Sequence, residues 1–460
     1  MGKLIPWRGI LMQFRFLKEK ITPDIPVLQM GFASRDHKSL GVHDDPYVSV
    51  VLLRANETVV IIALDVVYGD RSFAGGIKQA IQERFGLAQD QIIISYTHTH
   101  STVAVTGEDS ALRKKHTYHM AADKFAWDLE DEAEDFTEDI RYFQMIRSKI
   151  LSMIEEGINN PIEGDIHIAK GHSDFGISRR YPADGKILWK PNPDKNCMDP
   201  DLYLLKFTDR EGALRGLIYS YACHPTTLGP DNYYISADYP GIVRRILEER
   251  HPGLVPVFLQ GCGADIKPYI TADNGRFKSC NFAELEQASQ SLAADIENCL
   301  DQANWRKIEA SLATGFFEVK LYTEIWDAAQ WERILSDPNQ PDYRKKSIRQ
   351  TLQARQGEPV KDHLPYYLSY LRLDGQTCLI CLECEVVSDI GKEIKNLFRE
   401  DVITLGYTNS SACYIPTRKV LQDGGYERES FMSAHLAGPF VPEVEDIVVG
   451  RAALLVSDVK

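Results

Sequence analysis

Residues 58–101 read TVVIIALDVVYGDRSFAGGIKQAIQERFGLAQDQIIISYTHTHS, and the class of fold follows from this stretch. The β-branched, apolar run over 58–67 predicts a strand. Residues 71–86 predict a helix, because apolar side chains recur at helical spacing and a glycine stands at the end. Residues 91–96 predict a second strand. The stretch is therefore a βαβ unit, for which a right-handed crossover is expected.

Strand and helix patterns continue to alternate along the rest of the chain. Apolar runs predict strands over 213–223, 255–260, 308–321, 366–373, 377–383 and 401–407. Helical spacing predicts helices over 240–251, 283–303, 389–399 and 441–456. A further strand is expected to begin at Met12, so that residues 1–11 form a short N-terminal tail. We predict an α/β fold with a mixed β-sheet core and flanking helices, layered α/β/β/α, in one domain over residues 12–460.

Two polar stretches interrupt this pattern. Residues 104–150 contain the acidic block DLEDEAEDFTED at 128–139, which is most simply the solvated face of a helix. Residues 323–362 are rich in charge and helical in pattern. We interpret both stretches as insertions into the domain and expect them to form walls of its pocket.

The composition excludes several classes of protein. The 460 residues include 52 Lys and Arg and 66 Asp and Glu, which gives a net charge of −14. This acidity argues against binding to nucleic acid or to an anionic membrane. No apolar run approaches the ~20 residues that span a bilayer. The nine cysteines are too sparse for a disulfide scaffold, and the N-terminus lacks the features of a signal peptide, so a cytoplasmic location is expected.

The strongest local signal is the THTHS motif at 97–101, directly after a predicted strand. In extended chain, residues i and i+2 point to the same side, so His98 and His100 share a side at the carboxyl end of that strand. Two converging neutral imidazoles are good ligands for zinc. From the spacing alone, a metal or catalytic role and a hydrogen-bonded loop pair are both open.

Polar residues also end three other predicted strands. His224 follows the predicted strand 213–223. Asp265 and Lys267 lie in a glycine-rich turn after the predicted strand 255–260. Glu383 and Glu385 alternate with apolar positions at the end of the third. Each signal has a simpler interpretation: a lone histidine is more often structural, most glycine-rich turns are only turns, and the two glutamates would lie on one exposed sheet face.

Two further patterns favour a structural role. Tyr407 and Tyr414 lie in segments where a tyrosine usually belongs to the core. Cys378, Cys381 and Cys384 have the spacing C-x2-C-x2-C, which invites a zinc or iron–sulfur interpretation. In a strand, however, a spacing of three alternates between the two faces, so we predict that these cysteines are core residues.

Taken in order, these motifs resemble the catalytic domain of the neutral ceramidases, and more closely the short bacterial proteins grouped with that family. The resemblance extends over most of the chain, from residue 12 to residue 440. It is carried by ITP at 21–23, GFASR at 31–35, GVHDDP at 41–46, THTHS at 97–101, ISRR at 177–180 and ISAD at 235–238.

The resemblance implies a zinc site with roles for particular residues. The ligands of one zinc ion per chain would be His98, His224, Glu385 and Tyr414. His100 would line the reaction centre, and Arg179 would contact the substrate. Two imidazoles, a carboxylate and a phenol oxygen suit Zn²⁺ and leave room for a water.

The sequence departs from the family in three respects. Lys267 stands where the family has a serine at the reaction centre, so a serine-dependent cleavage does not carry over. No C-terminal immunoglobulin-like domain is expected, because the chain ends too early. Without a signal peptide, a membrane lipid met outside the cell is not the expected substrate.

These features predict a zinc-dependent hydrolase that attacks the amide or ester carbonyl of a small polar or anionic substrate. His100 is the candidate proton shuttle. Arg179 and Lys267 would hold substrate oxygens or an anionic group, and Asp265 would orient Lys267 or an imidazole. Three alternatives remain: cleavage of a lactone, sugar N-acyl or glycosidic bond, zinc and ligand binding without turnover, and purely structural histidines.

Overall fold

The computed structural model describes residues 12–108, 120–121, 135–354 and 361–457. The predicted tail over 1–11 lies outside these residues, as do most of the acidic block 128–139 and part of the stretch 323–362. Within the described ranges, every helix is too short or too polar to cross a membrane.

The expected βαβ unit is confirmed. Strands β4 (Thr58–Leu64) and β5 (Ile92–Tyr96) pair in parallel and are joined by helix α1 (Arg71–Phe85). The Asp70 side chain caps the first turn of α1, and Gly86 ends the helix in the left-handed conformation, with a φ of 73°.

A large mixed sheet holds most of the strands. Its order is β12 (Val255–Gln260), β10 (Leu214–Tyr221), β9 (Asp201–Asp209), β6 (Ile162–His172), β1 (Gln13–Lys20), β3 (Tyr47–Arg54), β4, β5, β21 (Asp401–Thr408), β19 (Thr377–Glu383), β18 (His363–Asp374) and β17 (Ala313–Tyr322), with β16 (Arg306–Ile308) beside β6. The pairs β4–β5, β10–β12 and β19–β21 are parallel, and the others are antiparallel.

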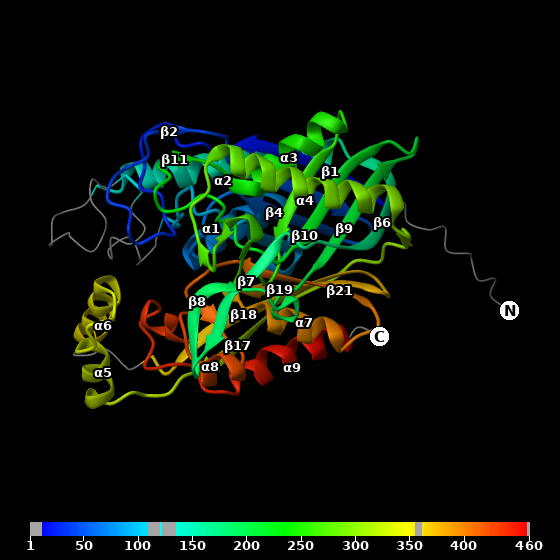
Figure 1. Ribbon diagram of the computed structural model, residues 1–460. Coiled ribbons are helices and arrows are strands. Elements are labelled where there is room, and N and C mark those ends of the chain that lie inside the picture. The colour runs from blue at the N-terminus through cyan, green and yellow to red at the C-terminus, as the bar shows by residue number, and fades with distance from the viewer. Residues whose placement is uncertain (1–11, 109–119, 122–134, 355–360, 458–460) are drawn as a thin grey trace.

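The sheet curls so that two of its parts face each other, and helices cover the outer faces (Figure 1). An apolar core joins the two parts, with Phe14 and Phe207 from one and Leu379 and Ile403 from the other. The covering helices are α1, α2 (Thr137–Asn159), α3 (Asp238–Arg250) and α4 (Phe282–Gln302) on the first part, and α7 (Ser388–Asn396) and α9 (Val444–Ser457) on the second. This is the predicted α/β/β/α layering.

The carboxyl ends of the strands in the two sheet parts meet. Strands β5 and β21 pair only at Ser95 and Thr408, close to the last residue of each. Directly after β12, Gly261 forms a bridge to Leu405 in β21. Polar residues follow several of these strands in the sequence, so the topology brings distant polar segments together.

The two stretches expected as insertions have different roles. Helices α5 (Ala328–Leu335) and α6 (Asp342–Ala354) occupy the second and pack on the core through Trp331 and Ile348. The first overlaps α2, which packs against β3, so part of 104–150 belongs to the framework. The remaining elements are β2 (Gly41–Val42), β7 (Gly176–Ala183), β8 (Lys186–Asn192), β11 (Tyr234–Ile235), β13 (Ile266–Pro268), β14 (Ala272–Asp273), β15 (Arg276–Phe277), β20 (Glu385–Val386), β22 (Tyr414–Ile415) and α8 (Arg418–Asp423).

Candidate functional site

Three side chains from distant parts of the chain converge at the strand ends. His98 follows β5, His224 follows β10, and Glu385 begins β20 just after β19. Glu385 Oε2 lies 3.1 Å from His224 Nε2 and 3.2 Å from His98 Nε2. The exposed fraction of the side chain is 2% for His98, 1% for His224 and 13% for Glu385. The three polar groups are therefore largely withdrawn from water.

Backbone carbonyls determine which nitrogen of each imidazole faces this centre. His98 Nδ1 lies 2.7 Å from Val67 O, and His224 Nδ1 lies 2.8 Å from Gly263 O. A carbonyl oxygen only accepts hydrogen bonds, so each Nδ1 carries the proton and donates it. Each Nε2 therefore faces Glu385. Without a metal it can donate a hydrogen bond to the carboxylate, and in the neutral ring its lone pair is free for a metal, which is the arrangement of a histidine that binds one.

The backbone is strained where it delivers these side chains. His98, Cys384 and Tyr407 have φ values of 65°, 68° and 55°, although none of them is glycine. Such conformations cost of order 1–3 kcal/mol each and cluster at functional sites. The turn at Cys384 separates the two glutamates beside it. The expectation of one exposed sheet face with both is wrong, because Glu383 is fully buried and only Glu385 faces the histidines.

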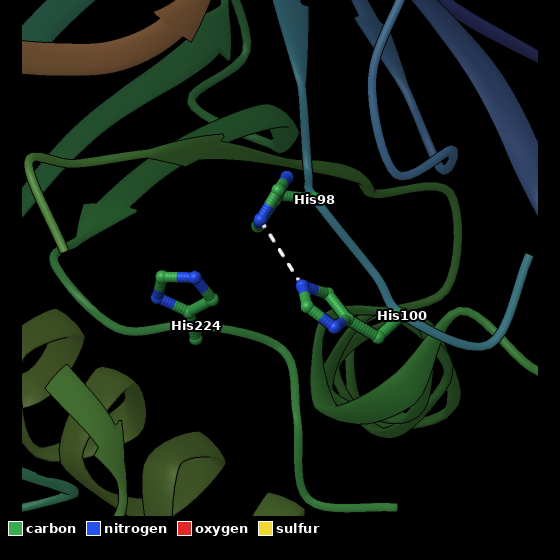
Figure 2. Close-up of side chains that lie close together, drawn as sticks. All are labelled: His98, His100 and His224. Carbon is green, nitrogen blue, oxygen red and sulfur yellow. Dashed lines mark hydrogen bonds between the residues drawn. The ribbon is translucent and has the colours of Figure 1, made fainter. Parts of the chain in front are cut away.

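His100 completes a cluster of three imidazoles (Figure 2). Its Nε2 lies 3.1 Å from His98 Nε2, and ligand atoms of His98, His100 and His224 lie within 4.8 Å of one another. A Cβ added to Gly31 would lie 2.4 Å from His100 Nδ1, so the glycine allows the chain to pack on the ring. Burial, together with the neighbouring imidazoles, lowers the pKa of His100 well below its usual value, which favours the neutral ring.

The converging atoms fit a metal ion. Atoms bound at about 2.0–2.1 Å around a tetrahedral ion lie roughly 3.3 Å apart. The separations of Glu385 Oε2 from the two Nε2 atoms, 3.1 and 3.2 Å, are close to this value. Burial opposes ionisation of Glu385, but His98 and His224 outweigh it and hold the pKa of that carboxyl well below its usual range. A carboxylate and two neutral imidazoles are donors that zinc accepts.

Two tyrosines flank this centre in different ways. The Tyr407 hydroxyl lies 3.5 Å from Glu385 Oε2, and its ring centroid is 4.4 Å from that of His98. The Tyr414 ring lies parallel to that of His224, with the centroids 6.5 Å apart. Tyr414 also pairs with Glu385 between strands β22 and β20. The role of Tyr414 as a ligand stays a prediction, and Tyr407 is a second phenol at the same centre.

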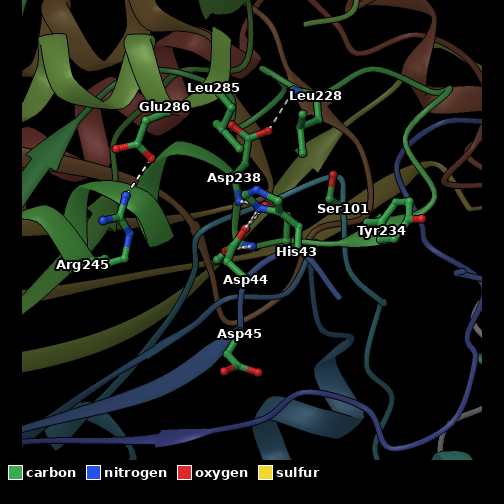
Figure 3. A network of polar contacts seen from close by, with 12 residues as sticks. His43, Asp44, Asp45, Ser101, Leu228, Tyr234, Asp238, Arg245, Leu285 and Glu286 are labelled. Carbon is green, nitrogen blue, oxygen red and sulfur yellow. Dashed lines mark hydrogen bonds and ion pairs between the residues drawn. The ribbon is translucent and has the colours of Figure 1, made fainter. Parts of the chain in front are cut away.

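Two of the sequence motifs hold the loop that follows β10. Asp44, in GVHDDP, accepts a hydrogen bond from Ser236 Oγ at 2.5 Å. Asp238, in ISAD, accepts hydrogen bonds from the amides of Thr227 and Leu228 at 3.3 and 3.1 Å (Figure 3). The motifs therefore stabilise the backbone that presents a histidine to the centre, and neither acidic side chain enters the centre itself.

A cavity of ≈ 600 Å³ opens onto the cluster. Its wall includes the loop 30–34 and residues that the sequence analysis singled out: His98, His100, Arg179, His224, Lys267, Glu385 and Tyr414. Helix α6 adds Arg344, Ser347 and Gln350, so the expectation that the stretch 323–362 walls the pocket is confirmed. No described residue of 104–150 lines this cavity.

Arg179 extends from β7 to the cavity and shares a carboxylate partner with its neighbour. Its Nε donates to Glu427 Oε1 at 2.9 Å, and Arg180 pairs with the same carboxylate. The guanidinium lies 4.2 Å from the ring centroid of Trp189 and 5.3 Å from that of Tyr414. Burial opposes the charge, but Tyr414 and Glu427 outweigh it and raise the pKa of Arg179, which stays a cation.

Lys267 reaches the cavity from β13, beside the first turn of the loop after β10. The amide of His224 donates to Ile266 O at 3.0 Å, which joins the two segments. The Lys267 ammonium donates to Thr226 Oγ1 at 2.9 Å. Burial lowers the pKa of Lys267 to about 8, so the side chain is mostly charged at neutral pH.

The Asp265 carboxylate is engaged elsewhere. It accepts hydrogen bonds from the Ser388 amide at 2.8 Å and the Ser388 hydroxyl at 3.2 Å, at the start of α7. These bonds lead away from Lys267, and the Nδ1 atoms of His98 and His224 are held by carbonyl groups instead. These contacts give Asp265 a structural role at the start of α7, rather than the expected role of orienting Lys267 or an imidazole. Burial raises the pKa of Asp265 to about 6.

The raised pKa of Asp265 predicts a pH-dependent stability difference for Asp265→Asn. An unfolded aspartate titrates near pH ~3.9, so the stabilising contribution of this group is complete below that pH and is lost as the pH rises through 6. Asparagine still accepts from the Ser388 amide and donates to its hydroxyl. We expect the variant to be more stable than the wild type by roughly 2 kcal/mol at pH 8 and equal at pH 4. Urea unfolding across this range tests the prediction, and parallel pH curves would contradict it.

The cysteine prediction holds in the structure. Cys378, Cys381 and Cys384 are free and buried. Cys378 and Cys384 pack in the core between β19 and α7, whereas Cys381 packs in the core between the two sheet parts. The alternation of faces along β19 therefore keeps the three sulfur atoms from converging on one metal.

Sequence reasoning missed the groups that balance and shape the cavity. Glu427 is the carboxylate partner that the two neighbouring arginines of β7 share, yet its own segment carries no chemical motif. Trp189 and Tyr426 form an edge-to-face pair on the cavity wall, with ring centroids 5.2 Å apart. Tyr407 is a core residue, as its segment predicts, and its hydroxyl also reaches Glu385, which that prediction does not include.

Comparison with known proteins identifies the fold. No protein-family model matches the sequence. The chain is similar to the neutral ceramidase from Pseudomonas aeruginosa, with a TM-score of 0.71 and 18% identity over 98% of this chain and 75% of that chain. A ceramidase complexed with C2 gives a TM-score of 0.70 and 16% identity over 98% of this chain and 76% of that one. The chain therefore has the fold of the neutral ceramidases, as its motifs led us to expect.

Proposed function

We propose that this protein is a zinc-dependent hydrolase that cleaves an amide or ester bond in a small polar substrate. The observation that supports this most strongly is the convergence of Glu385 Oε2 with the Nε2 atoms of His98 and His224, at 3.2 and 3.1 Å. These residues would hold one zinc ion per chain, and Tyr414 remains the fourth ligand that the motif resemblance implies. The shared fold favours amide cleavage, the reaction of a ceramidase.

The residues around the centre would have different roles in such a reaction. Bound Zn²⁺ supplies a Lewis acid and lowers the pKa of a water toward neutrality. His100, neutral and buried beside His98, accepts the proton of the attacking water and returns it to the leaving group. Arg179 and Lys267 hold substrate oxygens and stabilise the negative charge that develops on the carbonyl. With Lys267 in place of a serine, water attacks the carbonyl directly.

A second candidate function is the binding of zinc and a ligand without turnover. The lysine at the position of the family's serine favours it, because that serine belongs to the family's reaction centre. Purely structural histidines are the simplest alternative, and metal-free protein of unchanged stability would support them.

A panel of substrates, with and without metal, tests the proposed function. Zinc-loaded protein is expected to hydrolyse N-acyl amides or aryl esters, to lose this activity on treatment with a chelator, and to recover it when zinc is added back. His100→Ala is expected to lower kcat by about 10²–10⁴-fold while zinc content stays unchanged. Turnover of lactones alone would instead assign the lactone reaction. Ligand binding that is unaffected in His100→Ala, with no turnover of any substrate, would favour the binding protein.

A further inference from the structure

Lys267 is a buried cation that has no carboxylate partner among the described residues. Only 8% of its surface is exposed. Its ammonium group donates to Thr226 Oγ1 at 2.9 Å and to Thr226 O at 3.4 Å, and both acceptors are neutral. Lysines are almost never buried without a partner, because the charge loses its hydration. Because Lys267 also lines the cavity, a bound anion can supply the negative charge that its surroundings lack.

The other two cations on the cavity wall, unlike Lys267, each have a carboxylate partner. Arg179 shares Glu427 with Arg180, at 2.9 Å from its Nε, and Arg344 pairs with Glu429. Arg179 Nη2 is buried without a hydrogen-bond partner, so this arginine can still donate to a substrate oxygen. Lys267, without a carboxylate partner, is the group on the described cavity wall whose charge a ligand is best placed to neutralise.

The wall of the cavity combines aromatic side chains with polar groups, and it lacks an aliphatic stretch. No Leu, Ile or Val lies among the described residues that line it. Hydroxyl groups come from Ser34, Thr226, Ser347, Ser411, Ser430 and Ser433. A pocket for a long acyl chain would need a continuous aliphatic wall, which is lacking here.

The ammonium group of Lys267 lies beside the cluster of imidazoles. The backbone of Ile266, directly before it, is hydrogen-bonded to that of His224 at 3.0 Å. Lys267 also lines the same cavity as His98, His100 and His224. A group bound to this lysine is therefore only a short spacer away from a carbonyl at the centre.

We propose that the substrate carries a carboxylate that binds Lys267, while the carbonyl to be cleaved faces His98, His224 and Glu385. This inference rests on the hydrolase function proposed above. Thr226 uses two of the three ammonium hydrogens and leaves one for the substrate. The single charge of Lys267 matches that of a carboxylate better than that of a phosphate dianion. The substrate class is thus a short carboxylic acid with an amide or ester bond, such as an N-acyl amino acid.

Two matched esters test the proposal on the zinc-loaded, full-length protein. One is 3-acetoxybenzoate and the other is 3-methylphenyl acetate, which has a methyl group in place of the carboxylate. We expect kcat/KM to be about 10- to 100-fold higher for the anionic ester, mainly through a lower KM. In Lys267→Met this preference should disappear, and Lys267→Arg should keep part of it. No preference in the wild type, or a full preference in Lys267→Met, would overturn the proposal.

Lys78 provides a matched control for the removal of a buried lysine. It lies in α1, is 4% exposed and has a pKa that burial lowers to about 8, but it packs on Phe316 and does not line the cavity. Lys78→Met should keep the wild-type preference for the anionic ester. Equal losses in Lys78→Met and Lys267→Met would contradict a specific site at Lys267.

A binding measurement separates this proposal from the proposed hydrolase function. If zinc-loaded protein turns over neither ester, and neither of the matching amides 3-acetamidobenzoate and 3-methylacetanilide, the hydrolase function fails. Calorimetry with the two amides then tests the carboxylate site alone. Tighter binding of the anionic amide by the wild type, lost in Lys267→Met, would support the carboxylate site. Equal binding of both amides by the wild type would overturn it, whatever the variant does.

Discussion

Replacement of both His98 and His224 by alanine is expected to reduce bound zinc from about one ion per chain to none. Glu385 would then offer a carboxylate with no nitrogen ligand within 3.2 Å, except from a rearranged His100. A carboxylate and the phenol oxygen of Tyr414 do not hold Zn²⁺ against dialysis without a nitrogen ligand. Elemental analysis of wild type and variant, both purified without chelator and dialysed against the same trace of zinc, measures the difference.

The same variant should lose catalysis and the stabilisation that zinc gives. The metal supplies several kcal/mol of transition-state stabilisation, so kcat/KM is expected to fall by about 10³-fold or more. A ligand at 100 times its Kd stabilises the folded state by about 2.7 kcal/mol. The melting temperature of the wild type should therefore rise when zinc is added, and that of the variant should not. This second readout does not depend on knowing the substrate.

His251 supplies the control for the loss of a histidine that faces a carboxylate. It lies at the end of α3, 3.0 Å from Glu297 and away from the cavity. His251→Ala should keep one zinc per chain. Zinc retained in full by the double variant would place the metal elsewhere. A wild type that takes up no zinc would remove the proposed mechanism and leave only the shared fold.

Local patterns were sufficient to predict much of the framework. The bounds of β12 and β19 match the apolar runs 255–260 and 377–383, because a buried strand has to be continuously apolar. The strand-end rule also found His98 and His224 before their neighbours were known. Both residues follow such runs directly, and a ceramidase-like order of motifs then indicated Glu385. These predictions depend on information that lies within a few residues.

Long-range contacts could not be predicted in the same way. Arg179 and Glu427 are 248 residues apart in the sequence, and neither segment shows that it needs the other. The contact of Asp265 could not be predicted for the same reason, because its partner Ser388 belongs to a helix that begins 123 residues later. The separation of the two glutamates beside Cys384 depends on one positive φ in a non-glycine residue, which the alternation of residues does not reveal.

The ion pair of Glu383 with Arg71 has the largest expected effect on stability. Glu383 is fully buried at the end of β19. It accepts hydrogen bonds from Arg71 Nη2 at 2.6 Å, from Ser410 Oγ at 2.5 Å and from the Tyr367 amide at 3.1 Å. Burial raises the pKa of Glu383, and Arg71, Ser410 and the Tyr367 amide oppose this shift, so Arg71 favours the ionised form of the buried carboxyl.

Arg71→Met is therefore expected to lower the free energy of unfolding by about 3–5 kcal/mol at pH 8, because an unpaired charge remains buried. The loss should shrink as the pH falls, since without Arg71 the carboxyl has a raised pKa and binds a proton more readily in the folded state than in the unfolded one. Glu383→Gln added to Arg71→Met should recover part of the stability. Urea unfolding at pH 5 and pH 8 measures all three proteins.

Arg84, in the last turn of the same helix, separates this effect from the general cost of losing an arginine from α1. It pairs with Glu155 at 2.7 Å, with 44% and 51% of the two side chains exposed. Arg84→Met should cost less than about 1 kcal/mol, as exposed ion pairs do. Similar losses in Arg84→Met and Arg71→Met would refute the buried pair as the cause. Because Glu383 fixes the backbone just before Cys384 and Glu385, Arg71→Met should also weaken zinc binding, whereas Arg84→Met should leave it unchanged.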